Sequence, residues 1–470
     1  MKRLKILPTI GPSSEKENNI KTILGFTNIV RTNGSHNTID WHENISRKIK
    51  SINSEALHLL DIPGVKPRTN NFQTENISKN EIILFHFGKV KKSEYKKIKL
   101  TKPIPPIDSK NKFFFLADGQ FKFKILNFGT NFIIGKSYSS FELHPQKGLN
   151  IPDAIYNNEL QLKHYKSFLN KCHNIKYDVI GLSYVQSSDI IKKIRKKFSD
   201  KILVSKIENK EGLNNVNEII SESDVIMIDR GDLAAEVGNH NLFNAVLQIT
   251  YATKKQGKPL IMATENLISM FKKNEPTKSE IMSLGISSLI DGDFIMLSEE
   301  TAVSYNWHNT LKWLDNYLNK LRLVSLNDQL NILGNKKYLN DPLNDSSNSK
   351  LNPSIWESFK FNSNYNFVFI SRTGASIKEF KKKYKSNQSI VVTDRISTLN
   401  LCKFWKDVSP IYLKSIETFN NPVNMIKILK KYKNLIFNSN RNKAVCLFIL
   451  NPRKDSFANC IYFIDKKDFN

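Results

Sequence analysis

The feature that most constrains the fold of this chain is a repeated alternation of short apolar runs and amphipathic segments. Segments with a helical apolar pattern follow most of the runs, as at 187–198 and 241–257. Strand–helix alternation implies parallel pairing, and eight units predict an α/β fold built on a (β/α)8 barrel. In such a barrel the chemistry lies on the loops after the strands, where the polar tips of the runs fall. The eight runs occupy 4–11, 27–36, 56–64, 177–186, 202–209, 225–232, 258–266 and 293–301.

The alternation is interrupted between the third and fourth runs. This part of the chain contains only short apolar runs separated by turn formers such as Asp118 and Gly119, which predicts an inserted all-β domain. An insertion at that place is suited to act as a lid over the barrel mouth. The predicted organisation is barrel at 1–66, lid at 67–153, barrel again at 154–325, a polar linker at 326–352 and a C-terminal α/β domain at 353–470.

The chain is strongly basic, with 71 Lys and Arg against 44 Asp and Glu and a formal net charge of +27. The basic residues are dispersed and are not interleaved with aromatic residues, as a base-stacking groove would require. We therefore expect a solvated basic surface and no nucleic-acid partner. No apolar run approaches the roughly 20 residues of a membrane span, and the four cysteines are scattered. We expect no membrane partner and a cytoplasmic location.

Charged residues end the fifth and sixth runs. The fifth run ends in Lys206 and Glu208, and the sixth ends in Arg230 and Asp232. Because neighbouring parallel strands end at the same side of a sheet, these side chains should converge. Two carboxylates from separate elements suit a divalent cation such as Mg²⁺, and a lysine beside that cation suits a phosphoryl group in transfer. The pattern predicts an enzyme.

Seven motifs in order extend this interpretation to a family. The chain resembles the pyruvate kinase family over nearly its whole length, and the resemblance implies the same three-part architecture. It also implies transfer of a phosphoryl group from phosphoenolpyruvate to ADP, giving pyruvate and ATP in the last step of glycolysis. A homotetramer and a sugar-phosphate effector are further implications. The motifs are TIGPSS (9–14), RTNGSH (31–36), KGLNIP (147–152), SKIENKEG (205–212), RGDLAAEVG (230–238), PTKSE (276–280) and LSEETA (297–302).

The resemblance implies roles for individual residues. Lys206, Thr264 and Arg31 are the implied catalytic residues: Lys206 stabilises the phosphoryl group, and Thr264 orders a proton-donating water. Glu208 and Asp232 are the implied ligands of Mg²⁺ or Mn²⁺. The implied substrate contacts are Arg31, Ser183, Lys206, Asp229, Arg230, Gly231, Asp232 and Thr264, and the implied nucleotide contacts are Asn33, His36, Arg68, Lys147 and Asp118.

A K⁺ site is also implied, from Asn33, Ser35, Asp61 and the carbonyl of Ile62. Lys66, however, stands where K⁺-dependent members of the family carry a glutamate. Because a lysine ammonium could replace the charge of the ion, we predict activity that does not depend on K⁺.

Five residues depart from the family pattern: Pro63, Lys66, Asp229, Glu265 and Glu299. They support an alternative in which the chain is a degenerate homologue with a binding or regulatory role and little turnover. The extra charge of Asp229 could either tighten metal binding or repel the substrate. A third hypothesis, a basic nucleic-acid-associated protein, is supported by charge alone.

A glycine-containing loop in the C-terminal domain, within residues 370–380, also remains open. It fits a phosphate-binding loop at the start of a helix and, equally well, an ordinary strand–helix turn.

Overall fold

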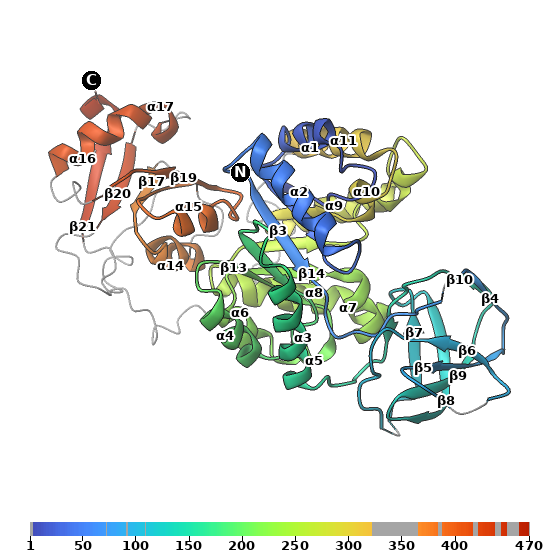
Figure 1. Cartoon of the computed structure of the whole chain (residues 1–470). Helices are drawn as coiled ribbons and strands as arrows, with labels where there is room; N and C mark the ends of the chain where they lie inside the picture. The colour runs from blue at the N-terminus through green and yellow to red at the C-terminus, as the bar shows by residue number, and fades with distance from the viewer. Residues whose placement is uncertain are drawn as a thin grey trace, which may run out of the picture.

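The computed structural model describes most of the chain and is drawn in Figure 1. The predicted linker at 326–352 lies outside the described residues. Within the described part, no helix combines the length and apolar character that crossing a membrane requires. The described residues are 3–71, 73–90, 93–108, 110–321, 365–383, 388–416, 422–437, 443–448 and 460–469.

Eight parallel strands form the barrel, and each lies within one of the eight predicted runs. Their order in the sheet is β1-β16-β15-β14-β13-β12-β3-β2, and a parallel bridge between Thr9 and Arg31 joins the two ends of that order. The predicted (β/α)8 barrel is therefore confirmed. The strands are β1 (Lys5–Pro8), β2 (Ile29–Asn33), β3 (Leu57–Ile62), β12 (Val179–Leu182), β13 (Ile202–Ile207), β14 (Val225–Asp229), β15 (Leu260–Ala263) and β16 (Phe294–Leu297).

Apolar residues on both faces explain why these runs become barrel strands. In β13, Ile202 and Val204 belong to the cluster inside the barrel, whereas Leu203 and Ile207 pack in the cluster under the helices. This alternation buries every residue of the strand, as expected of a parallel sheet covered on both sides.

Amphipathic helices surround the barrel. One of the motifs has a local role here, because Thr277 and Glu280 of PTKSE form the capping box that begins α9. The helices are α1 (Glu17–Leu24), α2 (Ile39–Ile52), α3 (Asn158–Lys171), α4 (Ser188–Lys197), α5 (Lys210–Asn214), α6 (Val216–Glu222), α7 (Arg230–Val237), α8 (Leu242–Lys255), α9 (Lys278–Leu289), α10 (Glu299–Ala302) and α11 (Trp307–Lys320), with short 3₁₀ turns η1 (Asn239–Asn241) and η2 (Ile268–Phe271).

Between β3 and α3 the described residues form strands joined by turns and irregular loops, with no helix among them, in agreement with the all-β insertion of the predicted fold. The larger sheet has the order β11-β7-β8-β9-β5-β6, and β10 pairs with β4. These strands enclose a core of their own, in which Phe85, Phe114 and Phe123 contact one another. The strands are β4 (Glu75–Ile77), β5 (Ile82–His86), β6 (Lys96–Lys99), β7 (Phe113–Leu116), β8 (Phe121–Gly129), β9 (Phe132–Ser137), β10 (Phe141–Leu143) and β11 (Leu149–Asn150).

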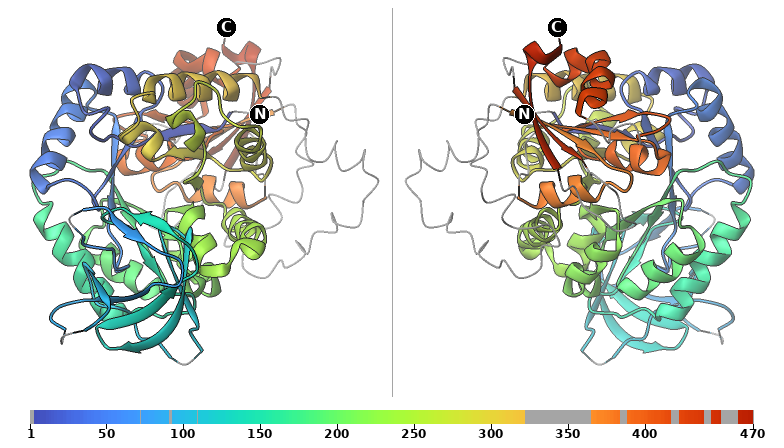
Figure 2. Two further views of the ribbon diagram at one scale, coloured as in Figure 1. Left: turned by 90° about the vertical axis from the view of Figure 1, so that its right-hand side faces the viewer. Right: turned by 90° about the vertical axis from the view of Figure 1, so that its left-hand side faces the viewer.

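The C-terminal part is an α/β unit on the other side of the barrel from the β insertion (Figures 1 and 2). Its sheet has the order β19-β18-β17-β20-β21, with only β21 antiparallel. Phe367 and Phe369 belong to the same apolar cluster as the barrel interior, so this unit covers the end where the barrel strands begin. Its elements are β17 (Tyr365–Ile370), α14 (Ala375–Lys383), β18 (Ser389–Thr393), α15 (Ile396–Cys402), β19 (Val408–Tyr412), α16 (Pro422–Leu429), η5 (Lys430–Tyr432), α17 (Lys433–Ile436), β20 (Lys443–Phe448), β21 (Cys460–Asp465) and η6 (Lys466–Phe469).

Candidate active site

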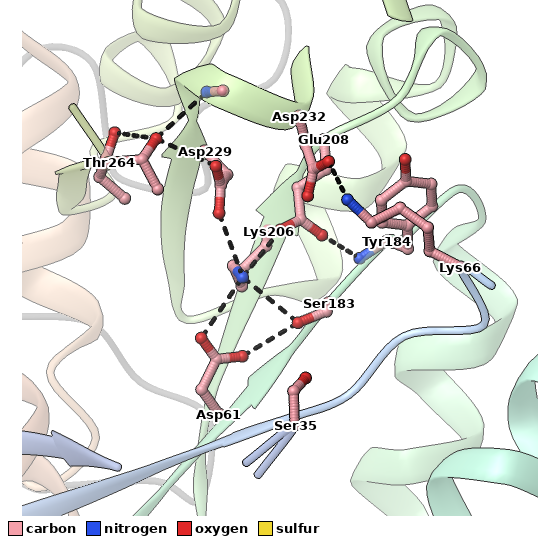
Figure 3. A network of polar contacts seen from close by, with 12 residues as sticks. Ser35, Asp61, Lys66, Ser183, Tyr184, Lys206, Glu208, Asp229, Asp232 and Thr264 are labelled. Atoms are coloured by element: carbon pink, nitrogen blue, oxygen red, sulfur yellow. Dashed lines mark hydrogen bonds and ion pairs between the residues drawn. The ribbon is translucent and has the colours of Figure 1, made fainter. Parts of the chain in front are cut away.

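Lys206, near the end of β13, is the central cation of the barrel mouth. Its Nζ lies 2.7 Å from Oε1 of Glu208, 3.3 Å from Oδ2 of Asp61 and 3.4 Å from Oδ2 of Asp229 (Figure 3). Burial alone would lower the pKa of Lys206, but the three carboxylates outweigh it and hold the pKa above its usual value. The site therefore holds a permanently charged ammonium where charge on a phosphoryl group could be stabilised.

Arg31, on β2, joins this group through Asp61. Its Nε and Nη2 lie 2.9 and 2.8 Å from Oδ2 of Asp61, and Nη1 donates to Oγ1 of Thr9 at 2.8 Å. Ser183 donates to the other oxygen of Asp61 at 3.0 Å. Burial would raise the pKa of Asp61, but Lys206 and Arg31 hold it below its usual value. Oδ2 of Asp61 thus contacts both Arg31 and Lys206, while Oδ1 holds the hydroxyl of Ser183.

Three carboxylates beside Lys206 form a compact group. Glu208, Asp229 and Asp232 are buried, and each offers an oxygen within 4.8 Å of the others. Burial, followed by the charges of Asp229 and Asp232, raises the pKa of Glu208 to about 8 against the opposing effect of Lys206. Crowded, buried carboxylate oxygens fit a hard divalent cation such as Mg²⁺ or Mn²⁺. The sequence pointed to Glu208 and Asp232, and the structure adds Asp229 to this group.

Lys66 connects the carboxylate group to the β insertion. Its Nζ forms an ion pair with Asp232 (Figure 3) and lies 3.2 Å from Oδ1 of Asp118, in the turn between β7 and β8. Burial lowers the pKa of Lys66, but Asp232 and Asp118 more than compensate and raise it. One ammonium is therefore shared by a candidate metal ligand of the barrel and an aspartate of the insertion.

Thr264, just after β15, links the carboxylate group to the start of α7. Its Oγ1 lies 3.0 Å from Oδ1 of Asp229 and accepts the N–H of Gly231 at 3.1 Å. Thr264 has a φ of +58°, which is rare for a β-branched residue and is found most often at functional sites. The N–H of Gly231, which we expected to bind the substrate, is thus already occupied by this hydroxyl.

Arg230 points away from the cavity at the barrel mouth. Its guanidinium donates to the carbonyl oxygen of Ala263 at 3.2 Å, to Ser283 at 2.7 Å and to Asn266 at 2.8 Å. These contacts fix the loop after β15 against α9. The structure therefore does not bring Arg230 together with Lys206, and its expected substrate contact has no support from this geometry.

A cavity of about 490 Å³ lies over these groups, between the barrel mouth and the β insertion. This volume is typical of small-molecule sites and exceeds what a three-carbon acid alone would fill. Five predicted site residues are not among the lining residues: Asp61, Ile62, Lys147, Arg230 and Gly231. The lining includes most of the predicted site residues: Arg31, Asn33, Ser35, His36, Arg68, Asp118, Ser183, Lys206, Glu208, Asp229, Asp232 and Thr264.

Cations gather around His36, on the side of the cavity where the resemblance implied nucleotide contacts. The pKa of His36 is lowered to about 4, first by its withdrawal from water and then by the charges of Arg68, Arg31 and Lys147. Arg68 also donates to the carbonyl oxygen of Gln146 at 3.0 Å, next to Lys147. A neutral imidazole surrounded by cations is an environment that attracts an anion.

Several supporting residues were not predicted. The backbone N–H of Tyr184 donates to Glu208, and the Tyr184 hydroxyl donates to Glu236 at 3.1 Å. Asn150 donates to Asp232 and to Glu236, each at 3.2 Å. Asn150 and Glu236 stand inside the motifs KGLNIP and RGDLAAEVG, so the sequence carried a signal for both. Nothing in the sequence marked Tyr184, whose φ of +65° is visible only in the structure.

Two of the remaining residues that we expected to depart from the family pattern lie at the same cavity. Pro63 and Glu299 line it. Glu265, which follows Thr264, has a pKa raised by burial against the opposing charge of Arg230.

The loop before α14 was the second candidate for anion binding. The N–H of Gly374 donates to Oγ of Ser371 at 3.0 Å, and the N–H of Ala375 donates to Oγ1 of Thr373 at 3.3 Å. Two of the amides that would hold a phosphate are thus used within the loop. This geometry favours the strand–helix turn over the phosphate-binding loop.

Comparison with known proteins gives a consistent result. The family model "Pyruvate kinase, barrel domain" matches residues 1–309. A pyruvate kinase of Methanocaldococcus jannaschii is 28% identical over 440 residues, which cover 92% of this chain and 93% of the relative. A pyruvate kinase of Encephalitozoon cuniculi is 29% identical over 323 residues, 66% of this chain and 73% of the relative. The chain therefore belongs to the pyruvate kinase family.

Proposed function

We propose that this protein is an active pyruvate kinase that transfers the phosphoryl group of phosphoenolpyruvate to ADP. The observation that carries the proposal is the buried ammonium of Lys206, held between Asp61, Glu208 and Asp229 at the floor of an open cavity. Phosphoryl transfer depends mainly on positioning and on stabilising charge, and this geometry supplies both.

In the proposed reaction, an oxygen of the ADP β-phosphate forms a bond to phosphorus while the bond from phosphorus to the enol oxygen breaks. Lys206 and Arg31 stabilise the negative charge on the phosphoryl oxygens during this exchange. Glu208 and Asp232, with Asp229 nearby, would hold the divalent cation, which would supply positive charge against the phosphate oxygens. The products are ATP and the enolate of pyruvate.

The enolate must then gain a proton at its methylene carbon. The hydroxyl of Thr264 borders the cavity beside Asp229. Its own pKa is too high for a free acid, so we propose that Thr264 orders the water that donates the proton. In the structure this hydroxyl is within hydrogen-bond distance of two acceptors, Oδ1 of Asp229 at 3.0 Å and the carbonyl oxygen of Ala263 at 2.8 Å.

The proposal includes cofactor and partner predictions that follow from the family. Mg²⁺ or Mn²⁺ is expected to be required. Because Lys66 carries a permanent charge next to the site, K⁺ is expected to be dispensable. A tetramer, a sugar-phosphate effector and a cytoplasmic location remain predictions of the same proposal.

A coupled assay that follows pyruvate formation tests the proposal. Purified protein with phosphoenolpyruvate, ADP and Mg²⁺ should form pyruvate, and omission of K⁺ should leave the rate unchanged. A rate that appears only after K⁺ is added would refute K⁺ independence but not the activity. Absence of turnover with either Mg²⁺ or Mn²⁺, with phosphoenolpyruvate binding retained, would refute the proposal.

Absence of turnover with retained phosphoenolpyruvate binding would favour the degenerate homologue, an alternative that one observation supports. The ion pair between Lys66 and Asp232 places a protein cation on a candidate metal ligand. In a degenerate homologue this pair would persist in the presence of Mg²⁺. Salt-sensitive DNA binding without turnover would instead favour the nucleic-acid hypothesis.

A further inference from the structure

A half-buried lysine on the lid side of the cavity has no role in the reaction described above. Lys102 follows β6 and lies beside the loop after β3, where its Nζ donates to the carbonyl oxygen of Gly64. The same Nζ lies 3.1 Å from Nε2 of His164, on α3. Lys102, Gly64 and His164 all line the cavity. Three separate segments of the chain therefore meet around this one ammonium.

The ammonium of Lys102 is incompletely satisfied by these contacts. A lysine ammonium has three N–H donors, and the described residues supply two acceptors, Gly64 and His164. Within the described chain no carboxylate lies within ion-pair distance of Lys102. The third N–H is available to a ligand in the cavity.

His164 is held in the form that accepts a hydrogen bond from Lys102. Its pKa is lowered to about 4, first by burial and then by the charge of Lys102, so the ring is neutral at physiological pH. A neutral imidazole has one acceptor nitrogen, and Nε2, at 3.1 Å from Nζ of Lys102, is placed to be that acceptor. His164 thus orients the ammonium and does not compete for an anion.

The charge distribution in the cavity indicates what the ligand is. The carboxylates near the floor are matched by Lys206 and Lys66. On the lid side, Lys102 lies near Arg68. Burial, followed by the charge of Arg68, lowers the pKa of Lys102 to about 8. Asp118 faces the same region, but its ion pair is with Lys66. The lid side therefore has an excess of positive charge.

A guanidinium and an ammonium on one wall, together with a cavity larger than a three-carbon acid requires, fit a second phosphate-bearing ligand. We propose that Lys102, oriented by Gly64 and His164, is a phosphate-binding residue for the diphosphate of the nucleotide. This inference rests on the proposed function, because it assumes that a nucleoside diphosphate shares the cavity with phosphoenolpyruvate. It adds a residue of the β insertion to the nucleotide contacts.

Calorimetric titration of ADP into the intact protein, with Mg²⁺ and without phosphoenolpyruvate, tests the inference. Lys102→Met should weaken ADP binding about tenfold, as expected for the loss of one charge-assisted hydrogen bond. Affinity for phosphoenolpyruvate should be unchanged, and Lys102→Arg should retain most of the affinity for ADP. Lys99→Met is the matched control, because Lys99 is exposed on the same segment. His164→Leu should weaken ADP binding less than Lys102→Met does.

Two further ligands identify the group that Lys102 contacts. Pyrophosphate should lose affinity in Lys102→Met as ADP does, whereas adenosine should bind both proteins equally. Equal ADP affinity in the wild type and Lys102→Met would overturn the inference, as would an equal loss for phosphoenolpyruvate. A wild type that binds ADP through Lys102 but forms no pyruvate would refute the proposed function and leave this inference standing.

Discussion

The two ends of the barrel each carry a buried group of charged residues, and the two groups are balanced in different ways. At the mouth, Lys206 is shared by three carboxylates, and the nearby cavity is open. At the opposite end, ammonium and carboxylate groups form close pairs beneath the C-terminal unit, and the pairs adjoin, because Lys254 also lies 3.9 Å from Asp291. These pairs are Lys254 with Asp293, Lys406 with Asp291 and Lys381 with Asp407, each at 2.5 Å.

The pKa values of Asp293 and Glu208 illustrate this difference, although burial also raises the pKa of Asp407 at the closed end. Asp293 is fully buried, yet Lys254 and Lys406 hold its pKa below the usual value. Glu208 is equally buried, but here burial, reinforced by the charges of Asp229 and Asp232, outweighs the effect of Lys206 and raises the pKa to about 8. The group at the closed end is complete without a ligand, whereas the group at the mouth would be completed by a divalent cation. Buried charge therefore marks a candidate site only where it is left unbalanced.

The largest effect that separates the two ends is expected from Lys206→Met. Loss of the ammonium should lower kcat by about 10³-fold or more, because the charge that stabilises the transferred phosphoryl group is gone. In excess Mg²⁺, which can neutralise the remaining acids, the free energy of unfolding should fall by less than about 2 kcal/mol. Steady-state kinetics and urea unfolding measure the two quantities. Lys210→Met is the control, because Lys210 forms an exposed pair with Asp153, and normal turnover in Lys206→Met would contradict the assignment.

The opposite result is expected for Asp293→Asn at the closed end. Asp293 accepts hydrogen bonds from Lys254 and from the N–H groups of Leu260 and Lys406. The variant leaves a buried ammonium poorly paired, so the free energy of unfolding should fall by about 3–5 kcal/mol, with kcat unchanged below the unfolding temperature.

A surface pair provides the comparison for this prediction. Asp315→Asn breaks the exposed pair with Arg3 and should cost less than about 1 kcal/mol. If Asp293→Asn proved as mild as Asp315→Asn, or if it lowered kcat in the folded protein, the distinction between the two ends would not hold.

The sequence predicts the mouth far better than the closed end. The eight runs and their polar tips identify the barrel and bring Lys206 and Glu208 to one end, because strand direction alone decides where a tip lies. Lys254 and Lys406 lie 152 positions apart and belong to no shared pattern. Their meeting depends on how the C-terminal unit docks on the barrel, and the chain pattern contains no information on that contact.

Within the site, backbone position is predictable but side-chain direction is not. Arg230 and Asp232 are two positions apart at the same strand tip, yet Asp232 lines the cavity and Arg230 contacts Ser283. Thr264 reaches Asp229 through a left-handed backbone conformation that residue type would not suggest. The partners of Lys66 could not be derived either, because Asp118 becomes its neighbour only when the insertion folds over the barrel.

The smallest effect is expected for Asp229. The structure allows us to distinguish its two interpretations, tighter metal binding and repulsion of the substrate. Its oxygen lies within reach of the same cation as Glu208 and Asp232, so we expect it to tighten metal binding. Asp229→Ala should weaken Mn²⁺ binding without phosphoenolpyruvate about tenfold, or about 1.4 kcal/mol, because it removes a carboxylate and leaves Lys206 less balanced. Titration followed by electron paramagnetic resonance measures this, with Glu208→Gln as the larger expected loss. Unchanged Mn²⁺ affinity together with tighter phosphoenolpyruvate binding would show that Asp229 repels the substrate instead. The two lysines would then balance the negative charge at the mouth, and Asp229 would not be a third carboxylate ligand of the metal.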